Sequence, residues 1–283
     1  MSRIDVRKTY KLYIGGAFPR SESGHSYEVT DSKGKFVANA ALASRKDARD
    51  AVTAARKAFP GWAGRTAYNR AQILYRIAEV MEDRRPQFVQ AVVQSEGLSA
   101  ARAEKVVDEA VDRLVWYAGW ADKITQVVGN ANPVAGPFFN LSTPEPTGVV
   151  AVLAPQESSL LGLVSVVAPV VVTGNTAVVV SSYERPLPAV TFSEVLATSD
   201  VPGGVVNILT GSAATIAPWL AGHMDVNAID LTGIAGETTL ATDLEVAAAD
   251  NLKRVRRAPT AEPGLDAMTA FLETKTVWHP IGV

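Results

Sequence analysis

The chain has 283 residues, enough for two domains of ordinary size or one large one. Apolar residues make up 47% and charged residues 20%, values typical of globular proteins and not of disordered or fibrous chains. Its 27 lysines and arginines against 29 aspartates and glutamates give a net charge of −2, so no global field favours nucleic acid or an anionic membrane. The absence of cysteine excludes disulfides, thiolate metal sites and cysteine nucleophiles.

The most apolar run, Leu160 to Val172, is too short for a membrane span, which needs roughly 18 apolar residues. We interpret it as a buried helix. The first residues are charged and lack an apolar stretch followed by a small-residue cleavage site. We therefore expect a cytoplasmic protein with neither membrane nor nucleic-acid partners.

Turn residues separate three short strands that are predicted near the start of the chain: Lys11 to Ile14, Ser26 to Val29 and Phe36 to Ala40. Three helices follow, because apolar residues recur at helical spacing after Ser44, over residues 74–81 and over residues 107–118. Asp47 lies three residues after Ser44, which predicts a near capping box at the first of these helices. The Gly, Pro, Asn and Thr content between Gly129 and Pro146 predicts a loop and an extended excursion.

Beyond Gly148, strand-like and helix-like runs alternate. The predicted strands are Val149 to Ala154, Ala177 to Val180, Val205 to Leu209 and Ala228 to Leu231. The predicted helices end at Val172, lie near residues 189–197 and cover residues 216–220. This alternation predicts an α/β fold, a Rossmann-like parallel sheet with flanking helices and with its ligand site at the carboxyl ends of the strands. The tail consists of a linker at residues 256–264 and a final extended segment, Phe271 to Trp278.

A series of motifs resembles, in order and at the same spacing, those of the NAD(P)-dependent aldehyde dehydrogenases. They are Lys11 to Gly16, Ala54 to Trp62, Glu145 to Val150, Ala168-Pro169 with Gly174-Asn175-Thr176, Val201 to Asn207, and Leu231-Thr232-Gly233. Each motif alone is weak, but the ordered set is specific and covers nearly the whole chain.

The chain departs from that family at the positions of its chemistry. Glu157 stands where the resemblance places the Asn of the oxyanion hole, and a carboxylate there would repel a developing oxyanion. Asn251 to Arg257 is similar to the segment before the family's general base, but the matching position is Ala258, which cannot accept a proton. The resemblance therefore implies no catalytic residue at either position, and an enzyme that is inactive on its own.

The cofactor positions that the resemblance implies are also altered. Val180 and Tyr183 replace the Lys and Glu that hold the adenosine ribose in the family. Glu237 adds negative charge where the family binds the pyrophosphate at a helix N-terminus. The glycines that remain in this degenerate site are Gly211, Gly233 and Gly236. We expect no cofactor, with weak NAD binding as the open alternative.

The resemblance divides the chain into three parts: a cofactor-binding domain at residues 1–258, a linker at 259–270 in place of the catalytic domain, and an oligomerisation strand at 271–283. Within the first part, residues at about 130–147 match an oligomerisation excursion. In the family this excursion and the last strand form a protruding sheet that pairs with a neighbouring subunit, so we interpret the missing domain as an internal deletion. The candidate oligomerisation residues are Phe138, Phe139, Leu141, Leu272, Thr274, Thr276, Val277 and Trp278.

Three functions remain open. The first is a non-catalytic structural subunit that assembles with a full-length, cysteine-bearing aldehyde dehydrogenase as a hetero-oligomer and stabilises or organises it. The second is a nucleotide-binding regulatory or sensor subunit that uses the remnant cofactor cleft. The third is an oxidoreductase that acts on aldehydes only as part of a complex. We favour the first function. Association of this chain with copies of itself is an additional candidate interaction.

Other features have structural interpretations. The histidines are interpreted as surface or loop residues and not as metal ligands: His25, His223 and His279. Glu157, followed by two serines, is interpreted as a carboxylate at a helix N-terminus and not as a repurposed acid. The basic residues at 253–257 are interpreted as a solvated face or a subunit contact. Val180 and Tyr183 are interpreted as core residues, in preference to an apolar wall that accepts another ligand.

Overall fold

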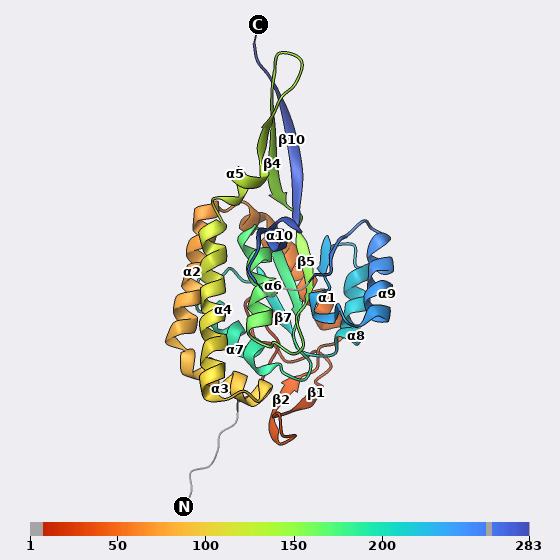
Figure 1. The fold of residues 1–283 in the computed structure, drawn as a ribbon. Helices are drawn as coiled ribbons and strands as arrows, with labels where there is room; N and C mark the ends of the chain where they lie inside the picture. Colours follow the sequence, from red (N-terminus) through yellow and green to blue (C-terminus); the bar gives the residue numbers. More distant parts are fainter. Residues whose placement is uncertain (1–7, 259–261, 283) are drawn as a thin grey trace, which may run out of the picture.

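The computed structural model describes residues 8–258 and 262–282. A five-stranded parallel sheet lies at its centre (Figure 1), with the strand order β7-β6-β5-β8-β9. The strands are β5 (Val149–Leu153), β6 (Thr176–Val180), β7 (Val206–Leu209), β8 (Ala228–Asp230) and β9 (Arg254–Arg256). The helices between them are α6 (Leu161–Val172), α7 (Leu187–Leu196), α8 (Ala213–Gly222) and α9 (Thr238–Ala249). The predicted Rossmann-like fold is confirmed.

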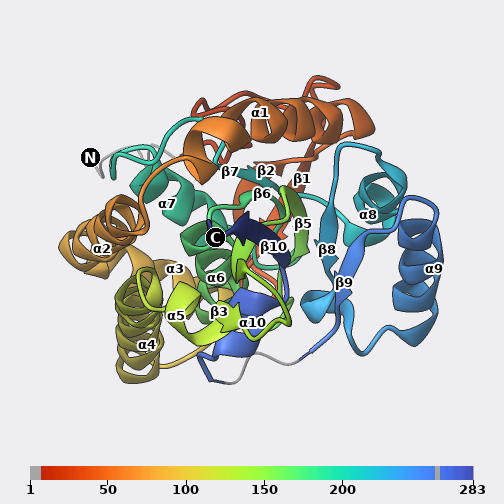
Figure 2. The same ribbon diagram turned by 90° about the horizontal axis from the view of Figure 1, so that it is seen from above.

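Helices cover both faces of this sheet (Figure 2). Successive side chains of a strand point to opposite faces, so Val149, Ala151 and Leu153 of β5 join one apolar core and Val150 and Val152 join the other. The first core includes side chains of α1 (Arg45–Ala63), α8 and α9. The second includes α2 (Ala67–Asp83), α4 (Ala100–Trp120), α6 and α7. The run at 160–172 forms the buried helix α6, as predicted, because it is apolar on all sides.

The N-terminal helices begin largely where the sequence indicates. Ser44 and Asp47 form the capping box of α1, in which the Ser44 hydroxyl accepts from the Asp47 N–H and the Asp47 carboxylate accepts from the Ser44 N–H. The prediction of three helices was wrong, because α3 (Arg85–Glu96) separates α2 from α4 and a short α5 (Ile124–Val128) follows. Pro86 lies in the first turn of α3, where its missing N–H costs no hydrogen bond.

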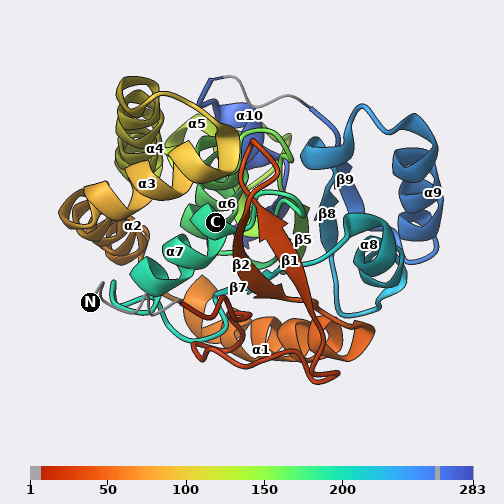
Figure 3. The same ribbon diagram turned by 90° about the horizontal axis from the view of Figure 1, so that it is seen from below.

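A two-stranded hairpin, β1 (Ser26–Thr30) and β2 (Phe36–Ala41), lies near the carboxyl ends of the parallel strands (Figure 3). The predicted strand over Lys11 to Ile14 is not formed. Tyr13 makes a single bridge to Ile208 of β7, with two hydrogen bonds exchanged, and Ile14 makes one to Ala17, whereas the preceding Tyr10 bridges to Ala40 of β2. Because the pairing partner changes from one residue to the next, no ladder can extend.

A separate three-stranded antiparallel sheet, in the order β10-β4-β3, projects from the opposite end of the molecule (Figure 1). Its strands are β3 (Asn130–Asn132), β4 (Phe138–Pro146) and β10 (Leu272–Pro280). Residues 138–146 pair with residues 272–280 over their whole length. The excursion and the final extended segment therefore lie side by side, and we name them together the protruding sheet.

The predicted linker contains a helix. α10 (Leu265–Thr269) packs on α6 and buries Ala267 and Met268, whereas residues 259–261 lie outside the described residues. Phe271, predicted to begin the final strand, is buried in the main core. Among the residues that the structure describes, no helix is both long and apolar enough to cross a membrane.

Candidate functional site

Loops at the carboxyl ends of β5, β6 and β7 surround a pocket of about 290 Å³. In open α/β sheets these loops form the ligand crevice, so we take this carboxyl-end pocket as the candidate site. Its lining residues are Gln156, Glu157, Ser182, Tyr183, Glu184, Ser212, Ala213, Ala214 and Glu237. Two of the residues predicted from the sequence, Glu157 and Tyr183, thus line one cavity.

The loops after β5 and β6 are tied to each other. The Gln156 side chain accepts a hydrogen bond from the Tyr183 N–H at 3.0 Å and donates one to the Ala154 carbonyl at 2.8 Å. The Ser182 hydroxyl donates to the Gln156 carbonyl at 2.8 Å. Arg185 donates to the Glu157 carbonyl at 2.6 Å and forms an ion pair with the Glu157 carboxylate at 2.7 Å. The chain's own residues therefore hold the two loops together.

Tyr183 is not a core residue, so that interpretation was wrong. Its side chain is 40% exposed and its ring stacks on Tyr27 of β1, with 4.6 Å between the ring centroids. The Tyr27 hydroxyl donates to the Tyr183 carbonyl at 3.0 Å. Burial and the neighbouring Tyr183 raise the pKa of Tyr27, so this donor keeps its proton. Val180, by contrast, ends β6 with no exposure, as expected for core packing.

The interpretation of Glu157 as a carboxylate at a helix N-terminus was also wrong. The N-cap residue of α6 is Leu160, and Ser158 supplies the side chain for the first turn, because its hydroxyl accepts from the Gly162 N–H at 2.9 Å. Ser159 donates from its N–H and its hydroxyl to Glu96, each at 2.7 Å. Glu157 instead extends into solvent, 85% exposed, and binds Arg185.

The glycines of the degenerate site serve different purposes. A Cβ on Gly233 would collide with the carbonyl of Ala154, so this glycine allows the loop after β8 to touch the end of β5. The Thr232 hydroxyl fixes the same loop by donating to the Ala258 carbonyl at 2.9 Å. Gly211 has a φ of +143° beside Ala43, whereas Gly236 is exposed and directly precedes Glu237.

The carboxyl-end pocket does not fit a dinucleotide. Three carboxylates line it, from Glu157, Glu184 and Glu237, and they would face a ligand that carries its own phosphate charge. Val180, at a position to which the resemblance gives a ribose contact, is fully buried and does not line the pocket, and the ring of Tyr183 already stacks on Tyr27. Glu237 is the N-cap residue of α9, and although its side chain makes no capping hydrogen bond, its negative charge lies close to the helix N-terminus that a phosphate would need.

A buried ion pair that the sequence analysis missed lies at the ends of β8 and β9. Asp230 and Arg256 are 1% and 7% exposed, with 3.4 Å between Oδ2 and Nη1. Arg256 also donates to the Thr232 hydroxyl at 3.0 Å and pairs with Asp266 of α10 at 3.5 Å. Burial raises the pKa of Asp230 despite the neighbouring guanidinium. Arg256 thus joins two strand ends to α10.

Of the basic residues at 253–257 only Arg254 is exposed, so they do not form a solvated face, and the alternative of a subunit contact stays a prediction. Lys253 is buried and donates to the His223 carbonyl at 2.8 Å, and burial lowers its pKa to about 8. Arg254 pairs with Glu273 of β10 at 2.6 Å, and Arg257 donates to the Ala235 carbonyl at 2.8 Å. Within the described ranges, no group of three or more His, Asp or Glu side chains could hold a metal ion.

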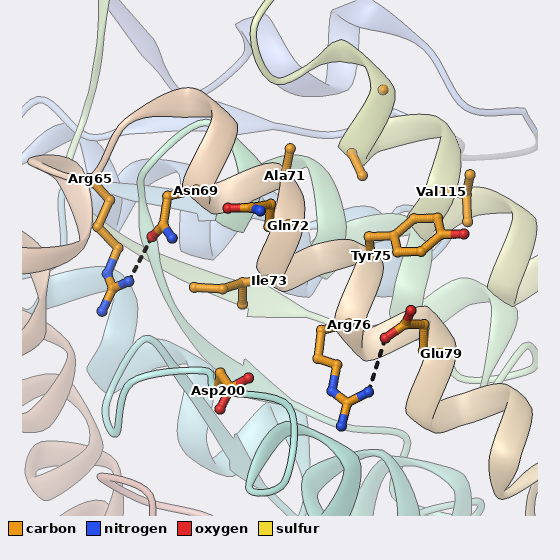
Figure 4. A pocket seen from close by; sticks show the side chains of 12 residues that line it. Arg65, Asn69, Ala71, Gln72, Ile73, Tyr75, Arg76, Glu79, Val115 and Asp200 are labelled. Carbon is orange, nitrogen blue, oxygen red and sulfur yellow. Dashed lines mark hydrogen bonds and ion pairs between the residues drawn. The ribbon is translucent and has the colours of Figure 1, made fainter.

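A larger pocket of about 750 Å³ lies between α2 and α4, away from the strand ends (Figure 4). Tyr75 of α2 extends towards Val115 of α4 along its edge. Arg76 at the same pocket already pairs with Glu79 at 3.0 Å, one turn further along α2. Because no carboxyl end of a parallel strand reaches it, we do not assign it to the site.

The predicted oligomerisation residues fall on both faces of the protruding sheet. Phe138 and Trp278 share one face, 38% and 58% exposed, with 5.7 Å between their ring centroids; Thr274 and Thr276 lie on the same face by register. Phe139, Leu141 and Val277 lie on the other face, and Phe139 and Val277 are 48% and 45% exposed. Leu272 is only 8% exposed and belongs to the main core, so it is not available for contact.

Comparisons with known proteins agree with this geometry. The aldehyde dehydrogenase family model matches residues 18–258. Cytosolic 10-formyltetrahydrofolate dehydrogenase of Mus musculus is 31% identical over 240 residues, 82% of this chain and 26% of that protein. Aldehyde dehydrogenase, cytosolic 1, of Elephantulus edwardii is 31% identical over 265 residues, 90% of this chain and 51% of that protein.

Solved structures agree as well. PnpE from Pseudomonas sp. WBC-3 has a TM-score of 0.83 at 29% identity, over 89% of this chain and 51% of that chain. An aldehyde dehydrogenase from Bacillus cereus, solved as its NAD+ complex, has a TM-score of 0.82 at 25% identity, over 88% of this chain and 50% of that chain. The present chain thus spans about half of the length of three of these relatives and about a quarter of the fourth.

The parallel sheet with helices on both faces and the crevice at its strand ends define a doubly wound α/β protein with a Rossmann-like fold. Within that class, the chain belongs to the aldehyde dehydrogenase family.

Proposed function

We propose that this chain is a non-catalytic subunit that assembles with a cysteine-bearing aldehyde dehydrogenase chain and stabilises or organises it. The observation that carries the proposal is the protruding sheet, which holds Phe138, Phe139, Val277 and Trp278 in solvent. Large apolar side chains gathered on an exposed sheet are typical of a protein contact surface. We expect the catalytic chain to cover these side chains on the two faces of the sheet.

The residues at the family's catalytic positions support the same proposal. The chain has no cysteine to form a covalent adduct with an aldehyde. Glu157 is paired with Arg185, and Ala258 offers only its carbonyl, which Thr232 already binds. Any contribution of this chain to aldehyde oxidation therefore has to pass through a partner.

The alternative of a nucleotide sensor is less well supported. The carboxyl-end pocket is lined by three carboxylates, and the loops after β5 and β6 are joined by the contacts of Gln156 and Arg185. Opening it for a nucleotide would break these contacts and bring a phosphate against like charge.

The test is co-purification through an affinity tag on this chain, followed by identification of the bound proteins by mass spectrometry. We expect to recover a cysteine-bearing aldehyde dehydrogenase. Its interface with this chain should bury about 2,000 Å² or more, as in obligate assemblies. A Phe138→Ser/Trp278→Ser variant should lose this partner. The matched control, Tyr68→Ser/Tyr75→Ser, changes two exposed aromatic residues of α2 and should retain it. Equal recovery with both variants would refute the proposed contact.

A further inference from the structure

A crevice between α3, α7 and the N-terminal segment is lined mostly by neutral polar side chains. Its volume is about 430 Å³, within the range of about 300–1,000 Å³ that small-molecule sites occupy. Figure 1 shows α3 and α7 in the half of the molecule away from the protruding sheet. The lining residues are Lys8, Tyr10, Gln87, Gln90, Ala91, Gln94, Thr191 and Glu194. We name this cavity the amide crevice.

Three glutamines share one face of α3. Gln87, Gln90 and Gln94 recur at intervals of three and four residues, so the Cβ atoms of successive members lie about 5–6 Å apart. Phe88 and Val92 lie on a different side of the helix and are fully buried in the main core. Packing of that apolar side therefore holds α3 with its three amides towards the crevice.

The three side-chain amides have no hydrogen-bond partner within residues 8–258 and 262–282. The hydroxyl of Tyr10 has none in these ranges either, and burial together with the neighbouring Glu194 raises its pKa, so it stays protonated. The Thr191 hydroxyl donates to the Leu187 carbonyl at 3.0 Å and keeps its lone pairs as acceptors. Amides and hydroxyls both donate and accept, which makes them complementary to the hydroxyl groups of a ligand.

The charged groups at the amide crevice are paired with one another. Lys8 Nζ lies 2.7 Å from the Glu194 carboxylate and 5.0 Å from the centroid of the Tyr10 ring. Arg84 approaches the same carboxylate at 3.8 Å. A charged ligand would compete with these pairs, whereas a neutral ligand leaves them intact.

We propose that the amide crevice binds a neutral polyhydroxylated molecule, a hexose or a related sugar alcohol. The amides of α3 and the Tyr10 hydroxyl exchange bonds to water for bonds to the hydroxyls of this ligand. Each exchange contributes little net free energy, so we expect a dissociation constant on the order of 1 mM. An apolar ligand fits less well, because Ala91 is the only residue without a polar side-chain atom among the described lining residues.

The test is titration of the purified full-length chain with methyl glucoside, followed by saturation-transfer NMR. We expect saturable binding. Gln90→Leu/Gln94→Leu keeps the size and helix propensity of both side chains but removes their amides, so it should weaken binding about tenfold or more. The matched control, Gln72→Leu, changes an exposed glutamine of α2 and should bind methyl glucoside as the unchanged chain does.

Tyr10→Phe is a second variant, because it removes one hydroxyl and keeps the ring against Lys8. It should weaken binding severalfold. Equal affinity of the unchanged chain and either of these variants, or no saturable binding at all, would overturn the proposal. Tighter binding of glucuronate or glucosamine than of methyl glucoside would also overturn it, because charge would then determine recognition.

This proposal and the proposed function fail separately, since the amide crevice shares no lining residue with the carboxyl-end pocket and lies away from the protruding sheet. Absence of sugar binding with continued recovery of a catalytic chain refutes only the sugar site. Sugar binding by a chain that recovers no catalytic chain refutes only the proposed function.

Discussion

Replacing Arg256 with Met should destabilise the fold strongly, because it leaves the carboxyl group of Asp230 buried without its guanidinium partner. Asp230 is 1% exposed and its ion pair with Arg256 measures 3.4 Å. Removing one partner of a buried pair costs about 3–5 kcal/mol. Arg256 also holds Thr232 and Asp266, so α10 loses its link to the sheet. For a domain of this size the loss corresponds to a fall in Tm of roughly 10 °C.

The assay is urea unfolding followed by circular dichroism, arranged as a double-mutant cycle with Asp230→Asn. Neutralising Asp230 in the Arg256→Met background should restore at least half of the lost stability, because no buried charge remains unpaired. The control is Arg254→Met, which breaks a partly exposed pair with Glu273 and should cost about 0–1 kcal/mol. Equal losses for Arg256→Met and Arg254→Met would refute the reasoning.

Further predictions concern pH, cofactor and activity. Burial lowers the pKa of Lys253 from 10.5 to about 8, so between these pH values the unfolded state binds more protons than the folded state. The free energy of unfolding should therefore rise with pH across this range. Lys253→Met should flatten that rise, whereas Lys105→Gln, at an exposed lysine, should not. Calorimetry should show that NAD binds about a hundredfold or more weaker than it would to a site that keeps two charge-assisted hydrogen bonds to the ribose. A micromolar dissociation constant for NAD would contradict this. Neutralising Glu157, Glu184 and Glu237 together with Gln should strengthen NAD binding, whereas unchanged affinity would argue against charge repulsion. The isolated chain should give no NAD or NADP reduction with aldehydes above a protein-free blank.

The parallel sheet could be predicted because each strand is short and apolar and each is followed by a helix. Helix α3 was missed because apolar side chains surround much of it, at 88, 89, 91, 92 and 93, so no single stripe stands out. The predicted strand at Lys11 to Ile14 failed for a different reason. Tyr13 and Ile14 bridge to two different segments, and a local pattern carries no information about distant pairing.

From the sequence, the candidate site could be predicted only at positions that belong to a local motif. Motif spacing located Glu157, Val180 and Tyr183, but not the stacking of Tyr183 on Tyr27, which lies 156 positions away. The pair Asp230 and Arg256 had a usable signal, since an aspartate in an apolar strand requires a buried partner. The identity of that partner depends on the parallel register of β8 and β9.

The most direct test of the proposed function is the native mass of the assembly isolated through a tag on this chain. The account predicts a species that contains this 30.0 kDa chain together with a cysteine-bearing aldehyde dehydrogenase chain in a fixed ratio. Aldehyde oxidation in that sample should belong to the cysteine-bearing chain. A species of 30.0 kDa, or one built only from copies of this chain, would contradict the assignment as a subunit of a catalytic assembly.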